Sequence, residues 1–193
     1  DGLVRFNPST LKVDYFEYDK NDPSSLSSSD INMIYEDFNG VLWIGTSSGL
    51  NRIHYGDNGA IRFKRVGAKD GFASEYISSI EADNKGFLWI STIQGISRYH
   101  PTNIEPVINY SQEQGLQHSE FYTRASHQDA DGTMYFSGVN GVSYFNPDEV
   151  VLGREISPIS ISNVSQGNIV YPVDEEAGAV SLEFDEILEI NIS

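Results

Sequence analysis

One segment recurs three times in this chain, at a fixed interval of 46 residues. The copies occupy residues 37–54, 83–100 and 129–146. The first two agree at nine of eighteen positions without a gap, and the shared residues follow the pattern Asp-x-x-Gly-x-Leu-Trp-Ile-x-Thr-x-x-Gly-x-x-Arg-x-His. The third copy is looser but keeps the register. A chain with such a period builds one small structural unit several times over.

Each copy predicts several short strands joined by tight turns. Residues 31–36 and 77–82 precede the Asp-x-x-Gly turn and favour strands by their alternation and β-branched content. Residues 42–46 are apolar on both faces, as expected of a strand buried on both sides. Residues 95–99 and 61–66 supply a third and an outer strand. A period in the forties with about four strands per copy is the signature of an all-β β-propeller.

Two positions of the repeat are expected where neighbouring blades meet. Blades pack face to face, so a large aromatic residue at one position can wedge between them. That position holds Trp43, Trp89 and Tyr135. A small residue at a second position predicts a place where the neighbouring blade or the central channel leaves no room. That position holds Gly45, Ser91 and Ser137.

The chain divides into two predicted domains. Residues 1–150 hold about three and a half blades, because the first residues match the repeat only from its second hairpin turn onward. They are therefore expected to be a fragment of a larger propeller. After residue 150 the period stops, and a truncated β-sandwich is predicted to begin in residues 151–193. Its alternating segments lie at residues 156–164, 169–171, 179–184 and 188–192.

Charge and composition exclude several classes of partner. The formal net charge is −16, and the 12 Lys and Arg residues are scattered singly. Such a surface repels phosphate backbones and anionic lipid, so neither nucleic acid nor a membrane surface is an expected partner. The absence of cysteine rules out disulfides and thiolate metal sites, and suits the cytosol or a bacterial periplasm equally.

The motif of residues 37–52, Asp-x-x-Gly-x-Leu-Trp-Ile-Gly-Thr-x-x-Gly-Leu-x-Arg, resembles the two-component-regulator propeller repeat. Residues 25–31 resemble the lead-in to that repeat, and residues 135–147 resemble the last blade before the ring closes. The segment from about Ile156 is similar to the opening of the Tyr-rich immunoglobulin-like domain that follows the propeller in that family.

The resemblance implies the periplasmic sensor region of a hybrid two-component system, anchored in the inner membrane by parts outside this chain. It implies an oligosaccharide ligand, control of polysaccharide-use genes and a homodimeric sensor. It also implies that this chain is no enzyme, and that the histidine kinase modules of the parent protein lie elsewhere.

A ligand face is predicted where inter-blade loops and second hairpin turns gather on one side of the propeller. Sugars bind through aromatic stacking and planar polar groups, so side chains of those kinds are the candidates. They are Tyr76, His118, Glu120, Tyr122 and Arg124 from the loops, with Gln94 and Asn140 from the hairpin turns. For each of them, ordinary solvated loop chemistry is the competing interpretation.

Other functions stay open at this stage. No catalytic triad, metal-ligand spacing or cofactor motif is present, and the Asp-x-x-Gly turns lack the Glu that completes a calcium loop. A protein–protein interaction scaffold is one alternative. A propeller-fold polysaccharide lyase or glycosidase is another, since a glycosidase needs only two carboxylates about 5 to 10 Å apart and acidic residues are plentiful.

Overall fold

The computed structural model describes residues 1–56, 59–102, 105–116, 118–150, 161–166, 169–172 and 188–192. The chain separates into two compact units, Asp1–Val150 and Val151–Ser193. Every strand pairing in the described residues is antiparallel. The helical content of these residues is limited to two short 3-10 turns, η1 (Ala68–Asp70) and η2 (Gln112–Gln114).

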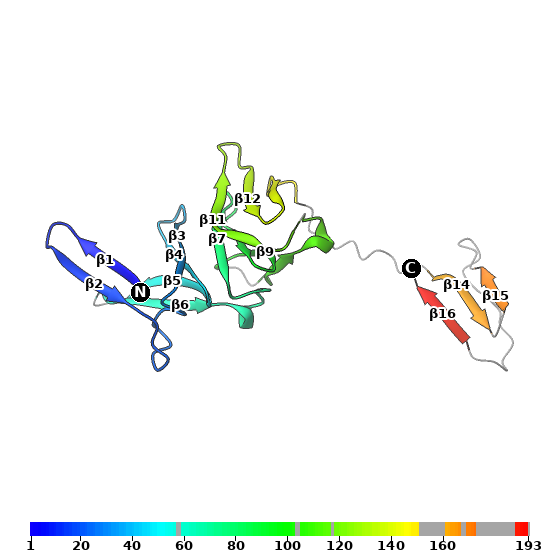
Figure 1. Ribbon diagram of the computed structural model, residues 1–193, viewed down its shortest axis with the longest axis horizontal. Helices are drawn as coiled ribbons and strands as arrows, with labels where there is room; N and C mark the ends of the chain where they lie inside the picture. The colour runs from blue at the N-terminus through cyan, green and yellow to red at the C-terminus, as the bar shows by residue number, and fades with distance from the viewer. Residues whose placement is uncertain are drawn as a thin grey trace. The chain divides into compact units, whose positions relative to one another are not determined.

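The first unit is a succession of sheets whose consecutive strands are neighbours (Figure 1). A hairpin comes first, formed by β1 (Leu3–Asn7) and β2 (Lys12–Phe16). Blade 1 consists of β3 (Ile31–Glu36), β4 (Leu42–Thr46), β5 (Gly49–Tyr55) and β6 (Ile61–Val66). Blade 2 consists of β7 (Ile77–Ala82), β8 (Leu88–Thr92), β9 (Gly95–Tyr99) and β10 (Ile108–Tyr110). Blade 3 consists of β11 (Phe121–Gln128), β12 (Met134–Gly138) and β13 (Gly141–Phe145).

This arrangement confirms the all-β, blade-by-blade fold predicted from the 46-residue period. The innermost strands β3, β7 and β11 contact one another in that order. Each blade therefore meets the next along its inner strand, as propeller blades do.

The second unit contains a three-stranded antiparallel sheet in the order β15-β14-β16. Its strands are β14 (Ile161–Gln166), β15 (Ile169–Pro172) and β16 (Leu188–Ile192). The strands expected at residues 156–164, 169–171 and 188–192 overlap these in their described parts. Residues 156–160 and the strand expected at 179–184 lie outside the described residues. A β-sandwich at this end of the chain stays a prediction.

Apolar residues from two successive sheets meet at each seam of the first unit. Between blades 1 and 2, Trp43 and Leu50 pack with Ile77 and Ile80 in one buried cluster. Between blades 2 and 3, Trp89 joins a cluster that includes Phe136. Each blade therefore depends on its neighbours to fold, because one sheet alone would leave these side chains in water.

The two tryptophans lie where the repeat predicted them. The ring of Trp43 meets that of Tyr99 on blade 2 edge-on, with centroids 6.2 Å apart, and Trp89 meets Phe145 on blade 3 at 4.9 Å. The small residue at the second position also has the expected cause. A Cβ added to Gly45 would lie 2.7 Å from Cγ2 of Ile77 on the next blade, which is closer than such atoms pack.

Candidate functional site

The candidate site is a surface that we call the tip face. It is formed by the second hairpin turn of each blade, at residues 47–48, 93–94 and 139–140, and by the inter-blade residues just before each inner strand, at 28–30, 74–76 and 118–120. Backbone hydrogen bonds join the two sets. The N–H of Ser47 donates to the carbonyl of Asp30 at 3.1 Å, and that of Val139 to the carbonyl of Glu120 at 3.3 Å.

Residues 118–120 connect two blades at this face. The carbonyl of Ser119 accepts a 2.7 Å hydrogen bond from the N–H of Gly95 in blade 2, while Glu120 accepts from the hairpin of blade 3. The geometry thus gathers three of the predicted ligand-binding residues around one inter-blade segment. All three are exposed: Gln94, Glu120 and Asn140.

Tyr76 occupies the position of Glu120 one blade earlier. The distance from Ile77 to Phe121, the first residues of the inner strands, is 44 residues, and Tyr76 and Glu120 immediately precede them. Tyr76 is half-buried, and its N–H donates to the hydroxyl of Ser74 at 3.1 Å. It therefore belongs to the tip face, with only part of its side chain open to a ligand.

His118 is placed differently from the other candidates, because its side chain is only 3% exposed. Its Nε2 lies 3.3 Å from the carbonyl oxygen of Gly141 and its ring packs against Phe121. In blades 1 and 2 the corresponding carbonyls, those of Gly49 and Gly95, accept from threonine hydroxyls. The imidazole N–H takes over that donor role in blade 3, so His118 supports the hairpin turn from inside.

A change within the repeat explains why a histidine is the donor in blade 3. The threonine position of the first two blades, Thr46 and Thr92, is Gly138 in blade 3. A Cβ at Gly138 would overlap the His118 imidazole. The sequence signal was the loss of threonine from the repeat together with a histidine nearby.

Tyr122 and Arg124 lie in an irregularity of the inner strand β11. In blade 2 the register passes from the pair Ile77–Thr92 to the pair Ser79–Ser91, which leaves a one-residue bulge. In blade 3 the pairs Phe121–Gly138 and Ser126–Phe136 enclose residues 122–125 on one strand and residue 137 alone on the other. The first residues of β7 and β11, Ile77 and Phe121, are 44 residues apart, whereas their last residues, Ala82 and Gln128, are 46 apart. Blade 3 therefore has two more residues than blade 2 inside this bulge.

The bulge exposes both predicted side chains beside the tip face. Tyr122 is 52% exposed and Arg124 is exposed as well. Phe121, just before them, pairs with Gly138, which immediately precedes the hairpin at 139–140. Bulges that redirect side chains in this way are enriched next to binding and catalytic sites.

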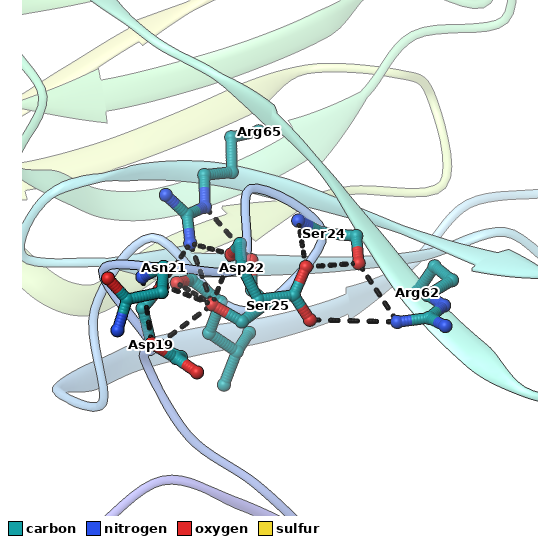
Figure 2. Close-up of polar contacts among 8 residues, drawn as sticks. Asp19, Asn21, Asp22, Ser24, Ser25, Arg62 and Arg65 are labelled. Atoms are coloured by element: carbon teal, nitrogen blue, oxygen red, sulfur yellow. Dashed lines mark hydrogen bonds and ion pairs between the residues drawn. The ribbon is translucent and has the colours of Figure 1, made fainter.

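A second polar cluster, which sequence reasoning missed, holds the loop that leads into blade 1 (Figure 2). Arg65 of β6 donates from Nε to the carbonyl of Ser25 at 2.9 Å, and from Nη2 to the carbonyl of Asp22 at 2.9 Å and the hydroxyl of Ser25 at 2.7 Å. Arg62 lies 3.6 Å from the carboxylate of Asp22. Both guanidinium groups are thus engaged in fixing residues 19–25.

Asn109 does the same for the loop before blade 2. It stands on β10, 44 residues after Arg65, donates to the carbonyl of Gly71 at 2.8 Å and accepts from the N–H of Ala73 at 3.2 Å. Because an arginine and an asparagine share this role, no common residue type marked it in the sequence. Outer strands therefore anchor the loops that build the tip face.

Glu81 of β7 is the one carboxyl in the described residues whose pKa is raised above its ordinary value. Burial against β11 causes the shift, and the hydroxyl of Ser126 and the charge of His127 oppose it.

No group of three or more His, Asp or Glu side chains that could hold a metal occurs in the described part of the chain. Nor does any helix there have the length and apolar character to cross a membrane.

Residues 25–48 and 71–94 match the family model described as two component regulator propeller. No curated protein matches the chain.

Several solved structures share its fold. The extracellular domain of the hybrid two component system BT3049 from B. thetaiotaomicron superposes with a TM-score of 0.71 and 24% identity, over 97% of this chain and 23% of that one. The extracellular domain of BT4673 from the same organism superposes with a TM-score of 0.62 and 22% identity, over 100% of this chain and 26% of that one. Virginiamycin B lyase from Staphylococcus aureus superposes with a TM-score of 0.52 and 14% identity, over 88% of this chain and 48% of that one.

The chain spans about a quarter of the length of the two B. thetaiotaomicron domains. Residues 25–48 and 71–94 are thus similar to the two component regulator propeller family, and the fold of the chain is similar to that of extracellular domains of hybrid two component systems.

Proposed function

We propose that this chain is part of the extracytoplasmic sensor region of a hybrid two-component system and that it binds an oligosaccharide. The observation that carries the proposal is the pair of two-component regulator propeller segments at residues 25–48 and 71–94. The similarity in fold to extracellular domains of such systems supports it. In this proposal the chain lies in the periplasm, the parent protein is a membrane-anchored histidine kinase, and ligand binding regulates polysaccharide-use genes.

The tip face is the proposed binding surface. It presents the amide side chains of Gln94 and Asn140, the carboxylate of Glu120 and the exposed ring of Tyr122 within one region of blades 2 and 3. Planar polar groups beside an aromatic ring are what a sugar needs, since hydroxyls pair with the former and the apolar ring face stacks on the latter. Sensing then requires a ligand that binds two states of the receptor with different affinity.

A thermal-shift screen against defined oligosaccharides tests this proposal. It should be run on this chain and on the full-length receptor that we propose carries it. A ligand at 100 times its Kd stabilises the folded state by about 2.7 kcal/mol. We expect a hit without turnover of the sugar. Release of cleaved or unsaturated products would instead favour a propeller-fold lyase or glycosidase.

A protein-docking scaffold is the second candidate, and an apolar sheet face favours it. On the hairpin of β1 and β2, Val4 stands opposite Tyr15 and Phe6 opposite Val13, and all four are exposed. A second copy of the chain, as in the proposed homodimer, would remove this face from water. Sedimentation of the wild type and of Tyr15→Thr measures the dimer affinity. If the face holds a dimer, the variant should dissociate into monomers at a higher protein concentration than the wild type.

A further inference from the structure

Arg124 has no partner in the described part of the chain, in contrast to the other five arginines there. Arg5 and Arg62 pair with carboxylates, Arg65 binds carbonyls, and Arg52 and Arg98 lie over aromatic rings. The guanidinium of Arg124 is exposed and contributes nothing visible to the fold. Its charge is therefore available to something outside the chain.

The backbone at Arg124 is also unusual. Its φ is 59°, in the left-handed region that non-glycine residues avoid because of the clash between Cβ and the carbonyl oxygen. The only other non-glycine residue with positive φ in the described residues is Leu11, in the turn between β1 and β2, whereas Arg124 lies within a strand. Backbone strain of this kind persists where the surroundings hold it, and it gathers at ligand sites.

We infer that the ligand of the tip face carries an anionic group, the carboxylate of a uronic acid or a sulfate ester, which Arg124 binds beside a sugar ring stacked on Tyr122. This inference rests on the proposed function. A guanidinium presents paired N–H donors that match the oxygens of a carboxylate or a sulfate. Tyr122, two residues away in the same bulge, supplies the exposed ring.

The negative charge of the chain opposes an anionic ligand. With a formal net charge of −16, the molecule repels an anion at a distance. An acidic sugar can bind only where a nearby positive group outweighs that repulsion. The arginine lies in the bulge opposite residue 137, on the strand that runs into the hairpin at residues 139–140.

Isothermal titration calorimetry on this chain and on the full-length receptor tests the inference. The ligands are oligogalacturonides, which carry carboxylates and no sulfate, carrageenan oligosaccharides, which carry sulfate esters and no carboxylate, and neutral xylo- and manno-oligosaccharides. We expect one acidic class to bind, which also tells a carboxylate from a sulfate. Arg124→Gln should weaken that binding about 10- to 100-fold, because it removes a charge-assisted pair. The affinity of Arg124→Lys should lie between those of the wild type and Arg124→Gln.

The matched control is Lys64→Gln, which removes one positive charge from the exposed side of the outer strand β6 and should leave the affinity unchanged. Binding of neutral sugars alone, or of acidic sugars regardless of Arg124→Gln, overturns this inference while the proposed function stands. Binding of no oligosaccharide by folded protein, as judged by circular dichroism, overturns both.

Discussion

The indole Nε1 of Trp89 donates a 2.9 Å hydrogen bond to Oδ2 of Asp83, the residue that begins the turn six positions earlier. Oδ1 of the same carboxylate accepts from the backbone N–H groups of Lys85 and Phe87, both at 2.9 Å. One buried side chain thus closes the turn and fixes the tryptophan that fills the seam to blade 3. Asp37 and Trp43 repeat this arrangement in blade 1 at the same distance.

Removal of this carboxylate should destabilise the first unit strongly. Asp83→Ala leaves buried donors without acceptors, since Asp83 is only 4% exposed. We expect a loss of about 2–4 kcal/mol in the free energy of unfolding, measured by urea denaturation. Asp83→Asn should also destabilise, because the amide NH2 would face the indole N–H.

The same position in blade 3 offers the control. Asp129 is exposed, and its Oδ1 lies 3.2 Å from Nε2 of His127. Asp129→Ala should therefore cost about 1 kcal/mol or less. Equal losses for the two alanine variants would show that burial of the carboxylate is not what matters.

Gly45→Ala should weaken the seam between blades 1 and 2. The added methyl would overlap Cγ2 of Ile77, so we expect a loss of about 1–3 kcal/mol. Gly67→Ala is the control, because its backbone is extended and its Cβ would meet only the flexible end of Glu75. In the double variant Gly45→Ala/Ile77→Ala the losses should be less than additive, and strict additivity would exclude the clash.

His118 and Gly138 should be energetically coupled. Gly138→Thr alone should destabilise, because its Cβ would overlap both the imidazole of His118 and the carbonyl oxygen of Glu120. His118→Ser alone should cost about 1–3 kcal/mol through the lost hydrogen bond to Gly141 and the space left beside Phe121. In the double variant the overlap with the imidazole is gone but that with the carbonyl oxygen of Glu120 remains, so the loss in thermal melts should be smaller than the sum of the two single losses.

Glu81 should make the stability depend on pH. Its pKa is raised from the ordinary 4.5 by burial, so the folded state holds this proton more tightly than the unfolded chain. The stabilisation by that proton is present below about pH 4.5 and is lost as the pH rises through the folded-state pKa. Glu81→Gln should accordingly raise Tm at pH 7.

That gain should shrink toward pH 4, where the wild-type carboxyl is protonated as well. Glu36→Gln, which changes an exposed carboxylate on β3, serves as the control and should alter Tm little at either pH. A gain for Glu81→Gln of the same size at pH 4 and pH 7 would contradict the assignment.

Replacement of Arg124 by glycine should stabilise the fold while removing the ligand-binding charge. Glycine adopts a φ near 59° without the Cβ clash, so Arg124→Gly should gain about 0.5–1 kcal/mol relative to Arg124→Ala, which keeps the clash. Chemical denaturation of the two variants measures the difference. Equal stability would mean that the bulge carries no backbone strain at this residue.

The location of several candidate residues could be predicted because hairpin tips and loops recur with the period, while their role in binding stays a prediction. The repeat indicated which turns share a face, and Gln94, Glu120 and Asn140 do meet around one segment. Burial of His118 could not be predicted in the same way. Its cause is the missing threonine side chain at Gly138, which matters only once the two residues are brought together.

By itself the sequence determined the elements that depend on local chemistry: the blade repeat, the Asp-x-x-Gly turns and the strands, since each is encoded within a few neighbouring residues. The tertiary structure decided the register between distant strands. The two additional residues of blade 3 could have been absorbed in the loop as well as in β11, and pairing with β12 settled them in the bulge at 122–125. Strand pairing and blade contact join residues far apart in the chain, and their geometry follows from packing that no single segment specifies.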